Sequence, residues 1–163
     1  MDSALAAVDR ASRWGSHAAC ACIAGATLLV LAEIAARKLF ATSLSFAWEY
    51  AAYLSAMAFL LGAGHALATG AHVRVQLVLD WLPARPARVL DVAATLGTTL
   101  IAGYFAWACV RLAWNSFADG TRTFLPSNSL LWPFQAAFAL GAVILTLQAA
   151  ARAVRLLRGE TPA

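Results

Sequence analysis

Residues 50–73 read YAAYLSAMAFLLGAGHALATGAHV, a stretch of 24 residues without Asp, Glu, Lys or Arg. An α-helix needs about 20 predominantly apolar residues to cross the roughly 30 Å hydrocarbon core of a bilayer. Because no water reaches that core, the backbone must satisfy its own hydrogen bonds, and an unbroken apolar run does so as a helix. The stretch therefore predicts a membrane-spanning helix.

Three further runs of the same kind flank this stretch. Each contains at least 19 residues without a charged side chain: 14–32, 92–110 and 123–151. With the first run they predict an all-α integral membrane protein with four transmembrane helices, forming a single membrane domain over residues 1–163. The expected spans are approximately 14–39, 46–71, 87–112 and 129–153.

The composition excludes an ordinary soluble protein. Hydrophobic residues make up 62% of the 163-residue chain and charged residues only 12%, against roughly 25% charged residues in typical soluble domains. A soluble chain of this size could not bury so much apolar surface. The net charge of +4 comes from basic residues that lie mostly between and outside the apolar runs, without a basic stripe interleaved with aromatics, so no nucleic-acid partner is expected.

The distribution of Lys and Arg predicts how the chain crosses the membrane. The N-terminal segment, the connection between the second and third spans and the C-terminal tail together carry eight of these residues, and the other two connections carry four. Because cytoplasmic segments are enriched in Lys and Arg, both termini are expected in the cytoplasm. The stretch that follows the second span is expected to be a short interfacial segment between spans two and three.

Residues at the expected helix ends suggest specific capping contacts. Ser43 or Ser45 would cap the second span, and a side chain within residues 127–129 would cap the fourth, because such groups accept hydrogen bonds from the free N–H groups of a first helical turn. Glu49 and Pro133 are expected in the first turns of these spans. There an acid meets the positive end of the helix dipole, and a proline removes no hydrogen bond.

Ionisable residues inside apolar runs are costly and are therefore candidates for function. Glu33 and Arg37 are four residues apart, with the acid first, which is the favourable order for an ion pair on one helix. The pair either stabilises the outer end of the first span or, in a small self-sufficient exporter, supplies Glu33 as the acid that couples transport to a gradient. Glu49 is expected to contact a partner chain, Arg37 or Lys38.

Two histidines offer a different class of function. His17 in the first span and His65 in the second are expected at similar depth, and paired imidazoles can hold a haem iron, as in a cytochrome-b-like membrane anchor subunit. The alternative is that His65, beside Gly62 and Gly64, hydrogen-bonds to a neighbouring helix. The sequence contains no HExxH or CxxC motif and no phosphate-binding loop, so neither catalytic residues nor a metal site are expected.

Residues 48–83, WEYAAYLSAMAFLLGAGHALATGAHVRVQLVLDWLP, resemble the signature region of the small membrane subunit of tripartite ATP-independent periplasmic (TRAP) transporters, the DctQ-like family. The matching residues are Trp48, Glu49, Tyr53, Leu54, Gly62, Ala63, Gly70, His72, Val73, Val75, Leu77, Leu82 and Pro83. Arg37 near the end of the first span and Pro133 within SNSLLWPFQ also resemble the family. Gln76 departs from the pattern, because the family usually has an acid at this position.

The resemblance implies a small, non-catalytic subunit in the bacterial inner membrane. It would scaffold a large multi-span permease, which takes up an organic acid, often a carboxylate, from a periplasmic substrate-binding protein. The permease would use a sodium or proton gradient, so this chain would need no cofactor, and membrane lipids would be its other partners. We expect the second span to face the permease where Gly62 and Gly64 permit close approach, and Arg74 to act as a topology charge.

Overall fold

The computed structural model describes residues 2–70, 83–125 and 127–159, and these ranges contain four long helices. Their bounds are α1 Asp2–Phe40, α2 Ala47–Ala68, α4 Ala84–Ala118 and α5 Trp132–Leu157. All four are long and apolar enough to cross a membrane. The expected all-α fold with four membrane-spanning helices is therefore confirmed. The expected interfacial segment between spans two and three falls largely outside the described residues.

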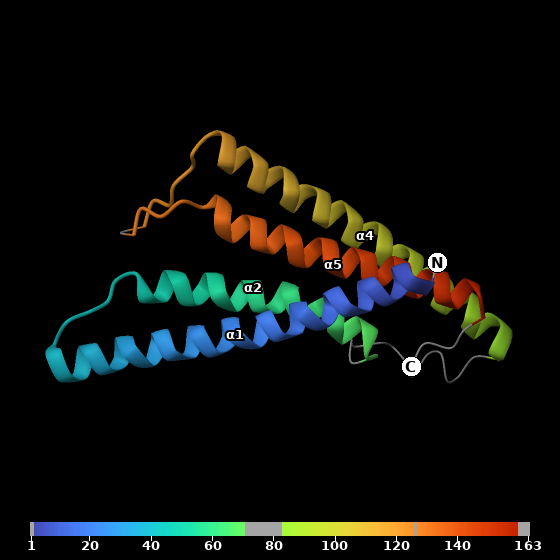
Figure 1. The fold of residues 1–163 in the computed structure, drawn as a ribbon, viewed down its shortest axis with the longest axis horizontal. Coiled ribbons are helices and arrows are strands. Elements are labelled where there is room, and N and C mark those ends of the chain that lie inside the picture. The colour runs from blue at the N-terminus through green and yellow to red at the C-terminus, as the bar shows by residue number, and fades with distance from the viewer. Residues whose placement is uncertain (1, 71–82, 126, 160–163) are drawn as a thin grey trace.

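The helices form two antiparallel pairs that are joined through α5 (Figure 1). α1 packs against α2 and α4 packs against α5, while α5 also contacts α2 and, less extensively, α1. Within the described residues, α4 contacts no helix other than α5. The start of α1 and the end of α5 lie together at one end of the bundle, which we term the terminal end; the connections that follow α1 and α4 lie at the opposite end, the loop end (Figure 1).

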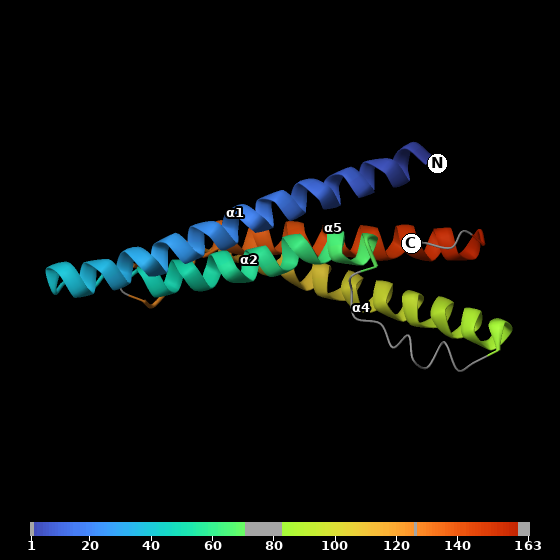
Figure 2. The same ribbon diagram turned by 90° about the horizontal axis from the view of Figure 1, so that it is seen from below.

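α1 begins at Asp2, well before the expected start near residue 14. Its first turns are rich in alanine, the residue that is most favourable in a helix. With 39 residues, α1 is about 58 Å long at 1.5 Å per residue, which exceeds the roughly 30 Å hydrocarbon core. The first turns pass beyond the end of α2 (Figure 2). Side chains of the N-terminal part of α1, Asp9 and Ser12, reach α5.

The expected serine caps at the starts of α2 and α5 are wrong. Neither helix has a side-chain hydrogen bond at its N-cap. Ser43 donates instead to Glu33 of α1, and Ser127 donates to Glu49 of α2. Glu49 and Pro133 do lie in the first turns of their helices, as expected. The serines at the loop end thus connect elements rather than cap helices.

Glycines allow α2 to pack closely between α1 and α5. A Cβ atom added to Gly141 of α5 would lie 2.8 Å from the carbonyl carbon of Leu60, and one added to Gly15 of α1 would lie 2.8 Å from the carbonyl oxygen of Leu61. Both contacts are with backbone atoms, which cannot rotate away, so the close approach requires a residue without a side chain. α2 is therefore held at Leu60 and Leu61 from two sides.

Candidate functional site

The first buried polar cluster is centred on Glu33, near the loop end of α1. Its carboxylate accepts hydrogen bonds from Arg37 (2.5 Å), from Ser43 (2.8 Å) and from the backbone N–H of Leu44 (2.5 Å). Glu33 is 1% exposed, whereas the side chain of Arg37 is 57% exposed. These bonds anchor the connection between α1 and α2 to the end of α1. They agree with the alternative in which the pair of Glu33 and Arg37 stabilises the outer end of the first span.

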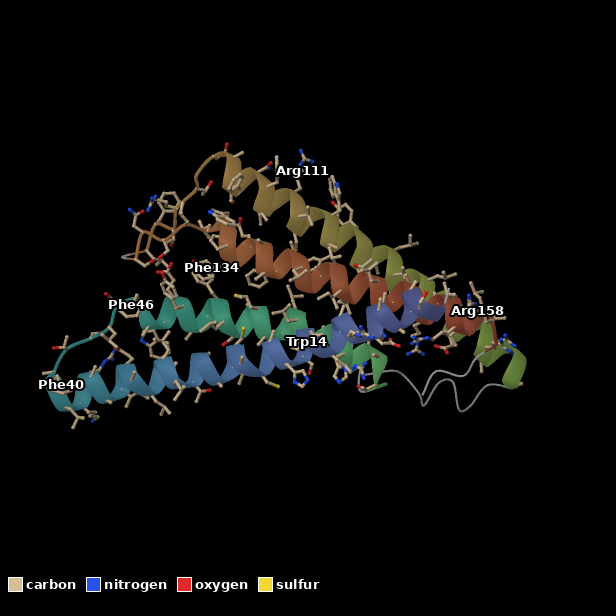
Figure 3. The ribbon with its side chains drawn as sticks, viewed as in Figure 1. Trp14, Phe40, Phe46, Arg111, Phe134 and Arg158 are labelled. Carbon is tan, nitrogen blue, oxygen red and sulfur yellow. The ribbon has the colours of Figure 1, made fainter. Side chains whose placement is uncertain are left out.

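The second cluster surrounds Glu49 in the first turn of α2. Its carboxylate accepts hydrogen bonds from the hydroxyls of Ser127 (2.6 Å) and Tyr53 (3.2 Å), and Glu49 is buried. The ring of Tyr53 stacks on Phe134 of α5, with ring centroids 4.4 Å apart, in the space between α2 and α5 (Figure 3). Glu49 therefore joins α2 to the connection between α4 and α5, and among the described residues it forms no ion pair.

The third cluster, which we term the terminal-end network, links the first turns of α1 to α5. Gln148 of α5 is 1% exposed; it accepts a hydrogen bond from Ser12 (3.1 Å) and donates one to Asp9 (2.9 Å). Asp9 also forms an ion pair with Arg155 at 2.7 Å. Together these bonds hold the N-terminal part of α1 against α5.

An ion pair joins α4 to α5 at the same end. Arg152 Nη2 lies 3.3 Å from Asp91 Oδ1, and the Arg152 side chain is 7% exposed. Neither this pair nor the contacts of Gln148 are expected from the sequence, which indicates only that the arginines of the C-terminal tail act as topology charges. A signal was present, since Gln148 lies in a run of 29 residues without charge, and a buried amide there needs hydrogen-bond partners.

The glycines of the signature region take part in packing within the chain. A Cβ atom added to Gly64 would lie 2.9 Å from the Ile144 side chain of α5, and one added to Gly62 would lie 3.5 Å from Ala19 of α1. Gly70, just after α2, has a φ of 71°, a left-handed conformation that favours glycine. The contact of this region with a partner subunit stays a prediction.

The other signature residues are distributed over both ends of the bundle. Trp48 at the start of α2 is 61% exposed, so it points away from the chain, while Glu49 beside it points inward. Pro83 is the N-cap residue of α4, and Pro133 lies in the first turn of α5. Arg74 and six signature positions lie outside the described residues: His72, Val73, Val75, Gln76, Leu77 and Leu82.

The two histidines are not brought together. Gly15 and Ala19 of α1 face α2, and the exposed His17 lies two residues from each, which places it about 200° around the helix from Gly15. The Nδ1 atom of His65 is buried and has no hydrogen-bond partner within the described ranges. This arrangement does not favour a haem held between the pair. Among the described residues, no three His, Cys, Asp or Glu side chains gather as a metal site would require.

The fold and the three clusters define a class of protein: a four-helix integral membrane protein whose buried ionisable groups join its own helices and connections. The family model of the DctQ component of tripartite ATP-independent periplasmic transporters matches residues 26–159. Because this match covers most of the chain, the chain belongs to that family and is a small membrane subunit of a TRAP transporter. No curated protein and no solved structure matches the chain significantly.

Proposed function

We propose that this chain is a non-catalytic scaffold that holds the large permease subunit of a TRAP transporter in the bacterial inner membrane. The permease would receive an organic acid, a carboxylate in chemical class, from a periplasmic substrate-binding protein. It would carry this substrate inward by symport with sodium ions or protons. In this proposal the substrate and the coupling ion bind to the partner subunits, and the small subunit needs no cofactor.

The observation that carries this proposal is the use that the chain makes of its buried ionisable groups. An acid that couples transport to a gradient must change its ionisation or its partners during the cycle. Glu33 and Glu49 are instead held by donors from the two connections at the loop end. Asp91 and Arg152 hold each other. The buried ionisable groups that could couple transport to a gradient are therefore engaged in contacts between helices and their connections.

The outward face of α2 offers a surface for the permease. Trp48, Ala52, Ser55 and Phe59 are all exposed and recur at helical spacing along one face, with Phe59 77% exposed. Two small residues between two aromatic rings let a partner helix approach closely and pack against the rings. We place the permease contact on this stripe, because Gly64 is already covered by α5.

The main test is uptake into proteoliposomes across an imposed sodium or proton gradient, with the substrate-binding protein and a panel of labelled carboxylates outside. The chain alone should give no uptake, the chain with its permease should transport, and the permease alone should transport less. Gradient-driven uptake by the chain alone would overturn the proposal. If Glu33→Gln abolished that uptake, the small-exporter alternative would take its place.

The contact surface has its own test. Ala52→Trp places an indole in the middle of the proposed stripe, and it should reduce the amount of permease that co-purifies with the tagged chain. Ala35→Trp is the matched control, since Ala35 is also exposed and lies in the loop-end half of α1. Equal losses from the two variants would remove the stripe as the site of contact without affecting the scaffold proposal itself.

A further inference from the structure

Arg88 lies near the start of α4, at the terminal end of the bundle. It is an exposed cation that the described part of the chain does not neutralise. Arg152 and Arg155 of α5, at the same end, are each paired with an aspartate. Arg88 belongs to none of the ion pairs among the described residues, and its guanidinium donates one hydrogen bond, at 3.4 Å, to the carbonyl oxygen of Leu156. A guanidinium has five N–H donors, and within the described ranges most of those of Arg88 have no acceptor and can serve a ligand.

A hollow of about 340 Å³ opens beside Arg88 on the surface of α4. Apart from the arginine, its described lining is apolar and consists of Val89, Val92, Ala93 and Leu96. Arg88 and Leu96 are eight residues apart, so the hollow extends about 12 Å along the helix toward the membrane interior. A cation at one end and a hydrocarbon wall along the rest match an amphipathic anion.

We propose that this hollow binds a phospholipid with an anionic headgroup, with its phosphate at Arg88 and an acyl chain against Val92 and Leu96. Guanidinium groups bind phosphate oxygens through paired N–H donors. Any lipid tail can cover the apolar wall, but the arginine at its rim favours a negatively charged headgroup. Arg88 lies in the second turn of α4, which begins at Ala84. The start of a membrane-spanning helix is expected near the headgroups.

The bound lipid would restrain the helix that the chain itself holds least. α4 contacts only α5 among the described helices. The Arg88 guanidinium lies beside the end of α5, where a Cβ atom on Gly159 would be 3.5 Å from its Nη2 atom. A phosphate bound at Arg88 therefore sits where α4 and α5 meet, and it would hold the two helix ends together at the terminal end.

Lipid titration of the purified full chain in mixed micelles tests the headgroup contact. The wild type should bind fluorescent phosphatidylglycerol more tightly than phosphatidylcholine. Arg88→Gln should weaken phosphatidylglycerol binding by about fivefold, the effect of one cation at an anionic membrane surface, and should leave phosphatidylcholine binding unchanged. Arg122→Gln is the matched control, because Arg122 is also exposed and donates to a single carbonyl, that of Asn128, at 3.1 Å.

A second pair of variants tests the hollow and separates a lipid from a free anion. Ala93→Trp fills the hollow without removing the cation, so it should lower phosphatidylglycerol binding; Ala94→Trp, at an exposed position outside the lining, should not. Inorganic phosphate, tested alone, should bind weakly and equally to the wild type and Ala93→Trp. Unchanged lipid binding by Arg88→Gln, equal losses in a control variant, or phosphate binding as tight as lipid binding would each overturn the proposal.

Discussion

Among single residues, Glu33 can be tested directly, because its carboxylate accepts three hydrogen bonds. Glutamine at this position offers one carbonyl oxygen to three donors and sets its own N–H groups against them. We expect Glu33→Gln to lower the midpoint temperature of unfolding of the detergent-purified protein. Arg37→Gln should lower it less, because water can replace the bond of a side chain that is 57% exposed. Tryptophan fluorescence during heating measures both, and a larger loss for Arg37→Gln would contradict this assignment.

Gln148 and Gln135 are two amides on α5 in opposite environments. Gln148 bonds to Ser12 and Asp9, whereas the Oε1 atom of Gln135 is buried and finds no hydrogen-bond partner in the part of the chain that the structure describes. Gln148→Leu leaves two bonded groups without their partner and should lower the free energy of unfolding by about 1–3 kcal/mol. Gln135→Leu removes an unsatisfied acceptor and should be neutral or stabilising. Unfolding by titration with a denaturing detergent compares them, and a comparable loss in both would be evidence against this contrast.

At the level of helices, the packing of α2 against α5 depends on Gly141. The methyl group of Gly141→Ala would press on the backbone of Leu60 at 2.8 Å, so the variant should lose about 1–3 kcal/mol of unfolding free energy. Gly97→Ala in α4 is the control, because its added Cβ would have no neighbour within 4 Å among the residues that the structure describes. That control should gain up to about 1 kcal/mol through helix propensity. Equal changes in unfolding free energy for the two variants would show that Gly141 does not pack tightly against Leu60.

The positions of the four helices could be predicted from the sequence because they depend on a local property, the length of a run without charge. The helix ends could not be predicted equally well. Ser127 looked like a cap for the fourth span, but its hydroxyl bonds to Glu49, 78 positions away in the sequence. Ser43 similarly bonds to Glu33 rather than to the start of α2. Pairing of a hydroxyl with a distant carboxylate depends on how the helices are arranged, which a single sequence does not show.

The same limit applied to the candidate site. The sequence singled out Gly62 and Gly64 as points of close helix approach, and Gly64 does pack tightly against α5. Gly15 and Gly141, which make the closest backbone contacts, were not distinguished from the other glycines, because nothing in the sequence says which face of a helix meets another. Glu33 and Glu49 were recognised as unusual from their position, and the pairing of Glu33 with Arg37 was predicted from their spacing and is confirmed. Their bonds to the serines of the two loop-end connections became known only from the fold.

At the scale of the whole molecule, the contacts between helices converge on α5. α5 touches each of the other three helices, and its buried polar groups connect it to α1 and α4. α4 lies at the edge, and its large side chains face outward, with Leu100 75% and Tyr104 71% exposed. A chain arranged in this way has an internally bonded centre and a broad apolar perimeter. That combination suits the proposed scaffold, which would hold a permease subunit in the lipid.

The ion pairs at the two ends of the bundle involve some of the Lys and Arg residues that indicate its orientation in the membrane. Of the eight Lys and Arg residues assigned to the terminal-end side, Arg152 and Arg155 are paired with aspartates; of the four on the loop-end side, Arg37 is paired with Glu33. Ion pairing does not change this count, because the orientation rule counts Lys and Arg and gives Asp and Glu little weight, so the excess stays at eight against four. Since retained Lys and Arg mark the cytoplasmic side, the terminal end is still expected in the cytoplasm.

Cysteine labelling in a bacterial host measures this orientation. In a variant without Cys20, Cys22 and Cys109, a new cysteine at the exposed position of Asp119, in the loop-end connection, should react with a membrane-impermeant maleimide on intact spheroplasts. A cysteine at the exposed position of Ser3, at the terminal end, should react only after the membrane is permeabilised. The reverse pattern would place the terminal end outside, because the two positions lie at opposite ends of helices that each cross the bilayer. It would also move the proposed phospholipid site to the outer leaflet, while leaving the lipid-binding test itself unchanged.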